Sequence, residues 1–66
     1  MDLEKKKLQF KKNDEIVITI EDLGKDGEGI GHVDGYALFV KGALPGEKVL
    51  VHLMKLNKNY GFARLV

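Results

Sequence analysis

The sequence lacks the side chains on which covalent catalysis depends. It contains neither cysteine nor serine, and its single threonine, Thr19, falls in a predicted strand. Nucleophilic catalysis needs an activated hydroxyl, thiol or amine beside a base, so we do not expect this segment to be an enzyme by itself. The absence of cysteine also excludes disulfides and thiolate metal sites, which leaves tightly patterned strands or an attached domain to stabilise so short a chain.

Long apolar runs and metal-binding patterns are scarce as well. A membrane helix needs roughly 20 apolar residues, and the apolar runs here end after about five, as in 36–40. With no signal-peptide pattern either, the sequence predicts no membrane partner and a cytoplasmic location. His32 and His52 have no carboxylate pattern of a metal site near them, so we interpret each as a surface or half-buried residue and expect no metal.

Charge is distributed unevenly along the 66 residues, although the net charge is only +1. Residues 36–66 carry five basic side chains against Glu47 alone, a net +4. This half is either an ordinary solvated surface or a face that binds a polyanion. Residues 1–13 hold five lysines without a strand or helix period, which predicts a basic, flexible arm whose Leu8 and Phe10 could touch a single domain at 14–66.

Alternating apolar and polar residues predict five short strands. The first covers 15–22, with Ile16, Ile18 and Ile20 facing the core, and the others cover 30–33, 36–40, 48–56 and 60–66. Asp34-Gly35 predicts a type I′ hairpin, and Pro45-Gly46 predicts a type II turn. The fold class is therefore all-β, a small five-stranded OB-like antiparallel β-barrel, with an SH3-like barrel as the near alternative.

Gly27, Gly29 and Gly31 occupy every second position, which would leave one face of a strand without side chains. Such a face suits a barrel corner or, alternatively, a place where an RNA backbone approaches closely. The run fails as a dinucleotide fingerprint, because the third glycine would have to stand at Asp34 and no helix follows.

These glycines, together with Gly35, Phe39-Val40 and Leu44-Pro45-Gly46-Glu47, resemble the core motif of the TRAM domain. The resemblance covers about residues 15–66, which makes 14–66 the expected TRAM domain, and implies a small OB-like barrel that binds RNA. The residues that it marks as structural are Gly24, Gly27, Gly29, Gly31, Gly35, Phe39, Pro45, Gly46 and Glu47. Phe39 is expected in the core, as large aromatic residues usually are.

Within this family the chain looks most like the N-terminal domain of bacterial uracil-C5 (5-methyluridine) RNA methyltransferases, on residues 13–23, 24–40 and 58–63. The resemblance implies a monomeric domain that delivers tRNA or rRNA, 23S rRNA foremost, to a C-terminal catalytic domain of the same protein. That catalytic domain would use S-adenosylmethionine and, in some members, an iron–sulfur cluster, while no cofactor is expected in these residues.

The chain ends directly after a predicted strand, which we interpret as a domain taken from a longer protein. Two alternatives stay open, a stand-alone TRAM RNA-binding protein and a protein-interaction barrel that docks an acidic partner. A C-terminal TRAM domain, as in methylthiotransferases, fits less well if Met1 is native.

Single-stranded RNA is held by basic side chains along its phosphates and by aromatic rings stacked on its bases. Tyr36 and Tyr60 are either stacking residues at a wet edge, which their hydroxyl groups favour, or half-buried structural tyrosines. The pattern leaves Phe62 ambiguous between core and surface. The candidate RNA-binding residues are Lys41, Lys55, Lys58, Tyr60, Arg64, Tyr36 and His32.

Overall fold

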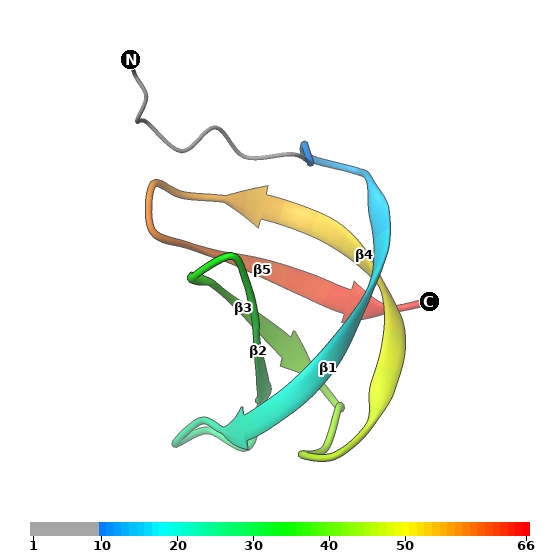
Figure 1. Ribbon diagram of the computed structural model, residues 1–66, viewed down its shortest axis with the longest axis vertical. Helices are drawn as coiled ribbons and strands as arrows, with labels where there is room; N and C mark the ends of the chain where they lie inside the picture. Colours follow the sequence, from blue (N-terminus) through cyan, green and yellow to red (C-terminus); the bar gives the residue numbers. More distant parts are fainter. Residues whose placement is uncertain (1–9) are drawn as a thin grey trace.

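The computed structural model describes residues 10–66, which form a five-stranded barrel (Figure 1). The strands are β1 (Glu15–Leu23), β2 (Gly29–Val33), β3 (Tyr36–Lys41), β4 (Lys48–Leu56) and β5 (Tyr60–Leu65). The predicted all-β class is confirmed, and each strand begins and ends within one residue of its expected position. Lys5, Lys6, Lys7 and Leu8 of the predicted arm lie outside the described residues. Within 10–66, no helix has the length and apolar character needed to cross a membrane.

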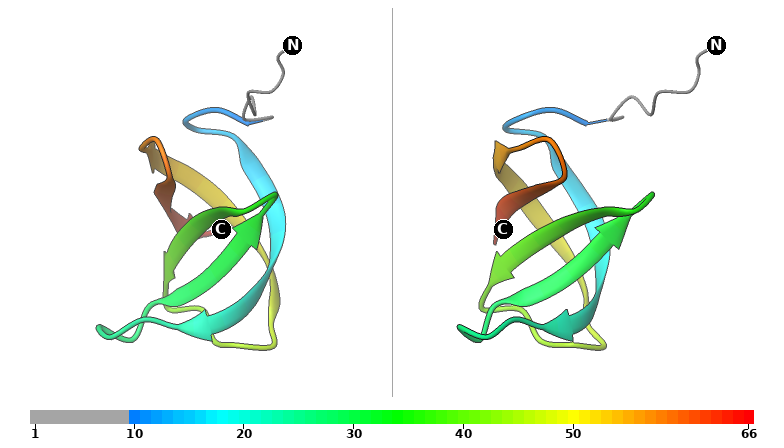
Figure 2. Two further views of the ribbon diagram at one scale, coloured as in Figure 1. Left: turned by 60° about the vertical axis from the view of Figure 1, so that its left-hand side comes forward. Right: turned by 90° about the vertical axis from the view of Figure 1, so that its left-hand side faces the viewer.

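The strands close in the order β1-β2-β3-β5-β4, and β1 also pairs with β4 (Figure 2). Four of the pairings are antiparallel. Strand direction alternates along the sequence, so β3 and β5, which β4 separates in the sequence, run parallel. This Greek-key order is that of an OB-type barrel, so it confirms the OB-like prediction over the SH3-like alternative. The one parallel pairing is a feature that alternation of apolar residues does not reveal.

Strand β1 bends so that it can belong to both halves of the barrel. Its first part, from Glu15 to Thr19, pairs with β4, and its last part, from Ile20 to Leu23, pairs with β2. The register with β2 shifts at Glu21, which marks a β-bulge, and bulges increase the local bend and twist of a strand.

Gly29 and Gly31 face this bend from β2, and both are buried. A Cβ atom on Gly29 would lie 2.7 Å from the carbonyl oxygen of Ala43, and one on Gly31 would lie 2.9 Å from that of Thr19. The barrel-corner interpretation is therefore confirmed for these two, and an approaching RNA backbone has no access to them. Gly27 is different, because it lies in the β1–β2 turn with φ +85° and belongs to no strand.

The predicted turns are also confirmed. Asp34 and Gly35 have φ values of 53° and 83°, both positive as a type I′ turn requires. Gly46 has φ 93°, and the N–H of Glu47 donates to the carbonyl of Leu44 at 3.1 Å, as expected for a type II turn. The carboxylate of Glu47 in turn accepts from the N–H of Leu44 at 2.9 Å, so this motif glutamate closes its own turn.

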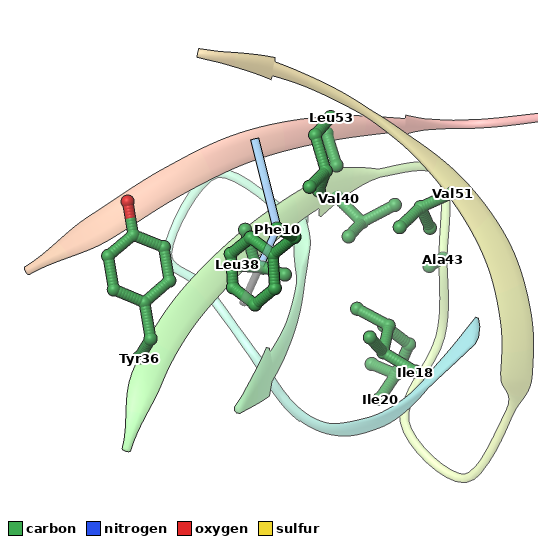
Figure 3. Packing of buried hydrophobic residues seen from close by; sticks show 10 residues of the cluster. Phe10, Ile18, Ile20, Tyr36, Leu38, Val40, Ala43, Val51 and Leu53 are labelled. Atoms are coloured by element: carbon green, nitrogen blue, oxygen red, sulfur yellow. The ribbon is translucent and has the colours of Figure 1, made fainter. Parts of the chain in front are cut away.

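The core is apolar and comes from alternate positions of the strands (Figure 3). Its buried members are Phe10, Ile18, Ile20, Tyr36, Leu38, Val40, Ala43, Val51, Leu53 and Ala63. Phe10 is only 8% exposed and packs edge-on against the ring of Tyr36, with centroids 5.7 Å apart. Phe10 therefore touches the barrel, as the sequence analysis allowed, and the N–H of Asn13 donates to the carbonyl of Leu53 at 2.8 Å.

Candidate nucleic-acid interface

The parallel pairing of β3 with β5 places outward side chains side by side. The outward pairs are Ala37 with Tyr60, Phe39 with Phe62, and Lys41 with Arg64. Between them, Leu38, Val40 and Ala63 point inward and are buried. The two strands thus present aromatic rings along one stretch of the seam and two cations at its end.

The rings of Phe39, Tyr60 and Phe62 form an aromatic cluster on the barrel surface. Their centroids are 5.6 to 5.9 Å apart, and Tyr60 and Phe62 remain 41% and 38% exposed. The prediction that Phe39 belongs to the core is wrong: its ring is half-buried on the outside, because Leu38 and Val40 occupy the inward positions of β3. Phe62, which the pattern left ambiguous, is also outside.

Four cations surround the aromatic cluster. Lys41 and Arg64 lie at one end, Lys55 lies opposite Phe62 on β4, and Lys58 is in the β4–β5 turn that leads to Tyr60. All four are exposed, and in the described part of the chain none forms an ion pair with a carboxylate. We call the aromatic cluster with Lys41, Lys55, Lys58 and Arg64 the basic–aromatic face. Its composition is that of a surface for single-stranded nucleic acid.

Tyr36 does not belong to this face, which corrects its assignment as a stacking residue. Its ring is 5% exposed, and its hydroxyl donates toward the carbonyl oxygens of Asn57 and Tyr60, at 2.6 and 2.7 Å. Two backbone acceptors satisfy the hydroxyl inside the barrel, so it needs no contact with water. Tyr36 therefore anchors the turn that carries Lys58 and Tyr60 and supports the face from behind.

Burial raises the pKa of Tyr36 above its usual 10.0, with a smaller contribution from the nearby Tyr60. A raised pKa means that the stabilisation is fully present below pH 10 and is lost as the pH rises through the folded-state value. In an alkaline titration of tyrosinate absorbance, we expect Tyr36 to ionise late and together with unfolding. Tyr36→Phe should lose this late step and about 1 kcal/mol of unfolding free energy. An ordinary ionisation of Tyr36 near pH 10 in the folded protein would contradict its burial.

The two histidines lie where the sequence analysis expected them, at the surface or half-buried. His32 is exposed on β2 next to Ala37, with its Nδ1 3.0 Å from a carboxylate oxygen of Glu21. His52 is half-buried, with its Nδ1 3.3 Å from Glu15. Among residues 10–66, no group of three or more histidine, cysteine or acidic side chains is placed to hold a metal ion. His32 therefore lies at the border of the basic–aromatic face and is not one of the residues that form it.

A hollow of about 300 Å³ opens at one end of the aromatic cluster. Its lining residues are Asp26, Glu28, Phe39, Lys41, Met54, Phe62 and Ala63. Sequence reasoning missed Asp26, Glu28 and Met54 as site residues. Met54 lies at a register shift between Leu53 and Lys55, and such an irregularity has no signal in an alternating apolar pattern.

Comparison with known proteins places this chain in a family. The chain matches the family model described as the TRAM domain over residues 9–66. It is 62% identical over 56 residues to an RNA methyltransferase of Listeria monocytogenes serotype 4b, covering 85% of this chain and 12% of that protein. It is 47% identical over 64 residues to an RNA methyltransferase of Halalkalibacterium halodurans, covering 97% and 14%.

The chain thus spans only about an eighth of the length of these curated relatives. Among solved structures, it is similar to a conserved protein of Methanococcus maripaludis determined in solution, with a TM-score of 0.83 and 33% identity. That similarity covers 91% of this chain and 86% of the archaeal one.

Proposed function

We propose that this chain, which belongs to the TRAM domain family, is a non-catalytic RNA-binding domain that brings substrate to the catalytic domain of an RNA methyltransferase. Its relatives from Listeria and Halalkalibacterium carry that name, and each is far longer than the matched segment. From the family resemblance, the proposed reaction is methylation of uracil C5 in ribosomal or transfer RNA in the cytoplasm. S-adenosylmethionine, and in some members an iron–sulfur cluster, would belong to the catalytic domain, and the protein would act as a monomer.

The observation that carries this proposal is the basic–aromatic face. Exposed rings of Tyr60 and Phe62 lie next to four cations on adjacent strands. Aromatic rings stack on any unpaired base, and lysine and arginine neutralise phosphates, so the combination supports binding of single-stranded RNA.

Removing the cations tests the proposal. If three or four of them contact phosphates, log affinity should fall with log salt with a slope of roughly −2 to −3, since each contact on a single strand contributes about 0.7. In fluorescence anisotropy with a labelled single-stranded RNA, changing Lys41, Lys55, Lys58 and Arg64 together to alanine should lower the affinity and flatten this slope. All four are exposed, so circular dichroism should show an intact barrel.

A control variant changes Lys11, Lys12 and Lys48 to alanine, because these lysines are exposed outside the basic–aromatic face. Its salt slope should stay within about 0.7 of that of the unchanged chain, the value of a single contact. Unaltered affinity of the fourfold variant would remove this face as the RNA site.

A stand-alone RNA-binding protein is the second candidate, and the archaeal structure favours it. This chain covers 86% of the Methanococcus maripaludis protein, so a chain of nearly this size exists there with the same fold. Both candidates use the same face. A protein-interaction role for this face would instead predict that an acidic peptide binds as tightly as RNA. This binding would not need the rings of the aromatic cluster.

A further inference from the structure

The hollow beside the aromatic cluster combines groups that differ from the rest of the face. Phe39 and Phe62 contribute aromatic surface, and Met54 contributes a thioether from β4. Asp26 and Glu28 reach the same hollow from the β1–β2 turn. Two acidic residues thus line the same hollow as the two phenylalanines, on an otherwise cationic surface.

The carboxylate of Glu28 is held in place by its own turn. Its Oε1 accepts from the N–H of Asp26 at 3.1 Å, and its backbone carbonyl accepts from the N–H of Gly24 at 2.7 Å. The side chain lies over Gly24 so closely that a Cβ atom there would be 2.5 Å from Oε2. Within residues 10–66, Oε2 accepts no hydrogen bond. Glu28 therefore holds a fixed carboxylate in the turn that lines the hollow, and Gly24 provides the space for it.

A carboxylate at this position repels a phosphate and can only accept hydrogen bonds while it is ionised. The partner that suits it is a base edge with adjacent N–H donors. Guanine alone among the four RNA bases presents two neighbouring donors, N1–H and the N2 amino group, on its Watson–Crick edge. Adenine and cytosine place an acceptor next to their amino group, and uracil places its single N–H between two carbonyls. The guanine O6, next to N1, also matches a cation, and Lys41 lines the same hollow.

We propose that this hollow receives an unpaired guanine base of single-stranded RNA. The base stacks on Phe39 and Phe62, its N1–H and N2 amino group donate to Glu28, and Lys41 approaches O6. This inference rests on the proposed RNA-binding function and adds base selectivity to it, because the phosphate contacts elsewhere on the face carry no sequence information.

The test compares four labelled uridine-rich RNA hexamers that differ only in one central base, G, A, C or U, in fluorescence anisotropy with this chain. Guanine should be preferred by on the order of tenfold, as expected for one bidentate contact. Inosine, which keeps N1–H and O6 but lacks the amino group, should recover only part of the preference.

Glu28→Gln is the decisive variant, because it keeps the side-chain shape and removes the second acceptor. The guanine preference should fall to about twofold or less, while the affinity for the A, C and U RNAs does not decrease, since a negative charge next to the RNA is lost. The matched control is Asp34→Asn, which removes one charge at the opposite end of the β2–β3 hairpin, where asparagine suits the positive φ. It should leave the preference intact.

Gly24→Ala provides a second variant, since the added methyl group displaces Glu28 without changing any charge. It should also reduce the guanine preference. Equal binding of all four RNAs, or an undiminished preference in Glu28→Gln, would overturn the guanine site while RNA binding itself stands. No binding of any of the RNAs would overturn the proposed function, and the guanine site with it.

Discussion

Gly29→Ala is expected to remove a large part of the free energy of unfolding of this chain. A Cβ atom on Gly29 would lie 2.7 Å from the carbonyl oxygen of Ala43 and 2.9 Å from Cγ2 of Ile20. Ala43 and Ile20 are both in the core, at 0% and 1% exposure, so neither can move aside freely. Overpacking of this kind costs about 1–3 kcal/mol. A core in so small a chain rarely supplies more than about 3–5 kcal/mol.

Urea denaturation followed by circular dichroism measures this effect as a lower midpoint. The control is Gly27→Asn, because position 27 has φ +85° and nothing within 4 Å of the added Cβ. Asparagine visits the left-handed region without a large penalty, so this change should cost less than about 1 kcal/mol. A Gly29→Ala midpoint equal to that of the unchanged chain would show that the barrel corner does not depend on the missing side chain.

The strands and turns were predictable because their signals are local. Ile18 and Ile20 in β1, and Val51 and Leu53 in β4, alternate with polar residues, and each is buried in the structure. The Asp34-Gly35 hairpin followed from the two residues themselves, since few other pairs adopt two positive φ values.

Strand β3 was harder to interpret, because residues 36–40 are all apolar. Alternation then cannot indicate which of these side chains face inward. General tendencies then favoured a buried Phe39, which was wrong, and left Tyr36 open between a stacking residue and a structural one. Leu38 and Val40 take the inward positions together with Tyr36, whose hydroxyl meets two carbonyl groups of the distant β4–β5 turn. Such contacts depend on tertiary structure, which is absent from a local pattern.

The candidate site likewise combines residues that the sequence predicted and residues that only the tertiary structure brings into it. Lys41, Tyr60 and Arg64 were identified by residue type, and the parallel β3–β5 pairing then placed them on one face. Glu28 was not among the predicted site residues, because its place in the lining of the hollow depends on how the β1–β2 turn folds back over Gly24. Non-local strand pairing, β-bulges and turn geometry therefore account for the site features that could not be predicted from the sequence.

Replacing both Tyr60 and Phe62 by leucine is expected to weaken binding of single-stranded RNA at least about tenfold. Base–aromatic stacking is worth about 1–3 kcal/mol per base, and leucine has no π-face on which a base can stack. Leucine still covers Phe39 and keeps the apolar area of the surface, so the free energy of unfolding should change little. The measurement is anisotropy titration of a labelled RNA over a series of salt concentrations.

The salt series separates stacking from phosphate contact. The leucine variant should bind more weakly at every salt concentration with an unchanged slope, because its four cations remain, whereas the fourfold alanine variant should lose slope. Tyr60→Phe keeps the ring, and Leu50→Ala changes an exposed apolar residue that pairs with Val17 away from the basic–aromatic face, so neither should alter affinity. If the leucine variant binds as tightly as the unchanged chain, the exposed rings do not stack on bases and the cations alone hold the RNA.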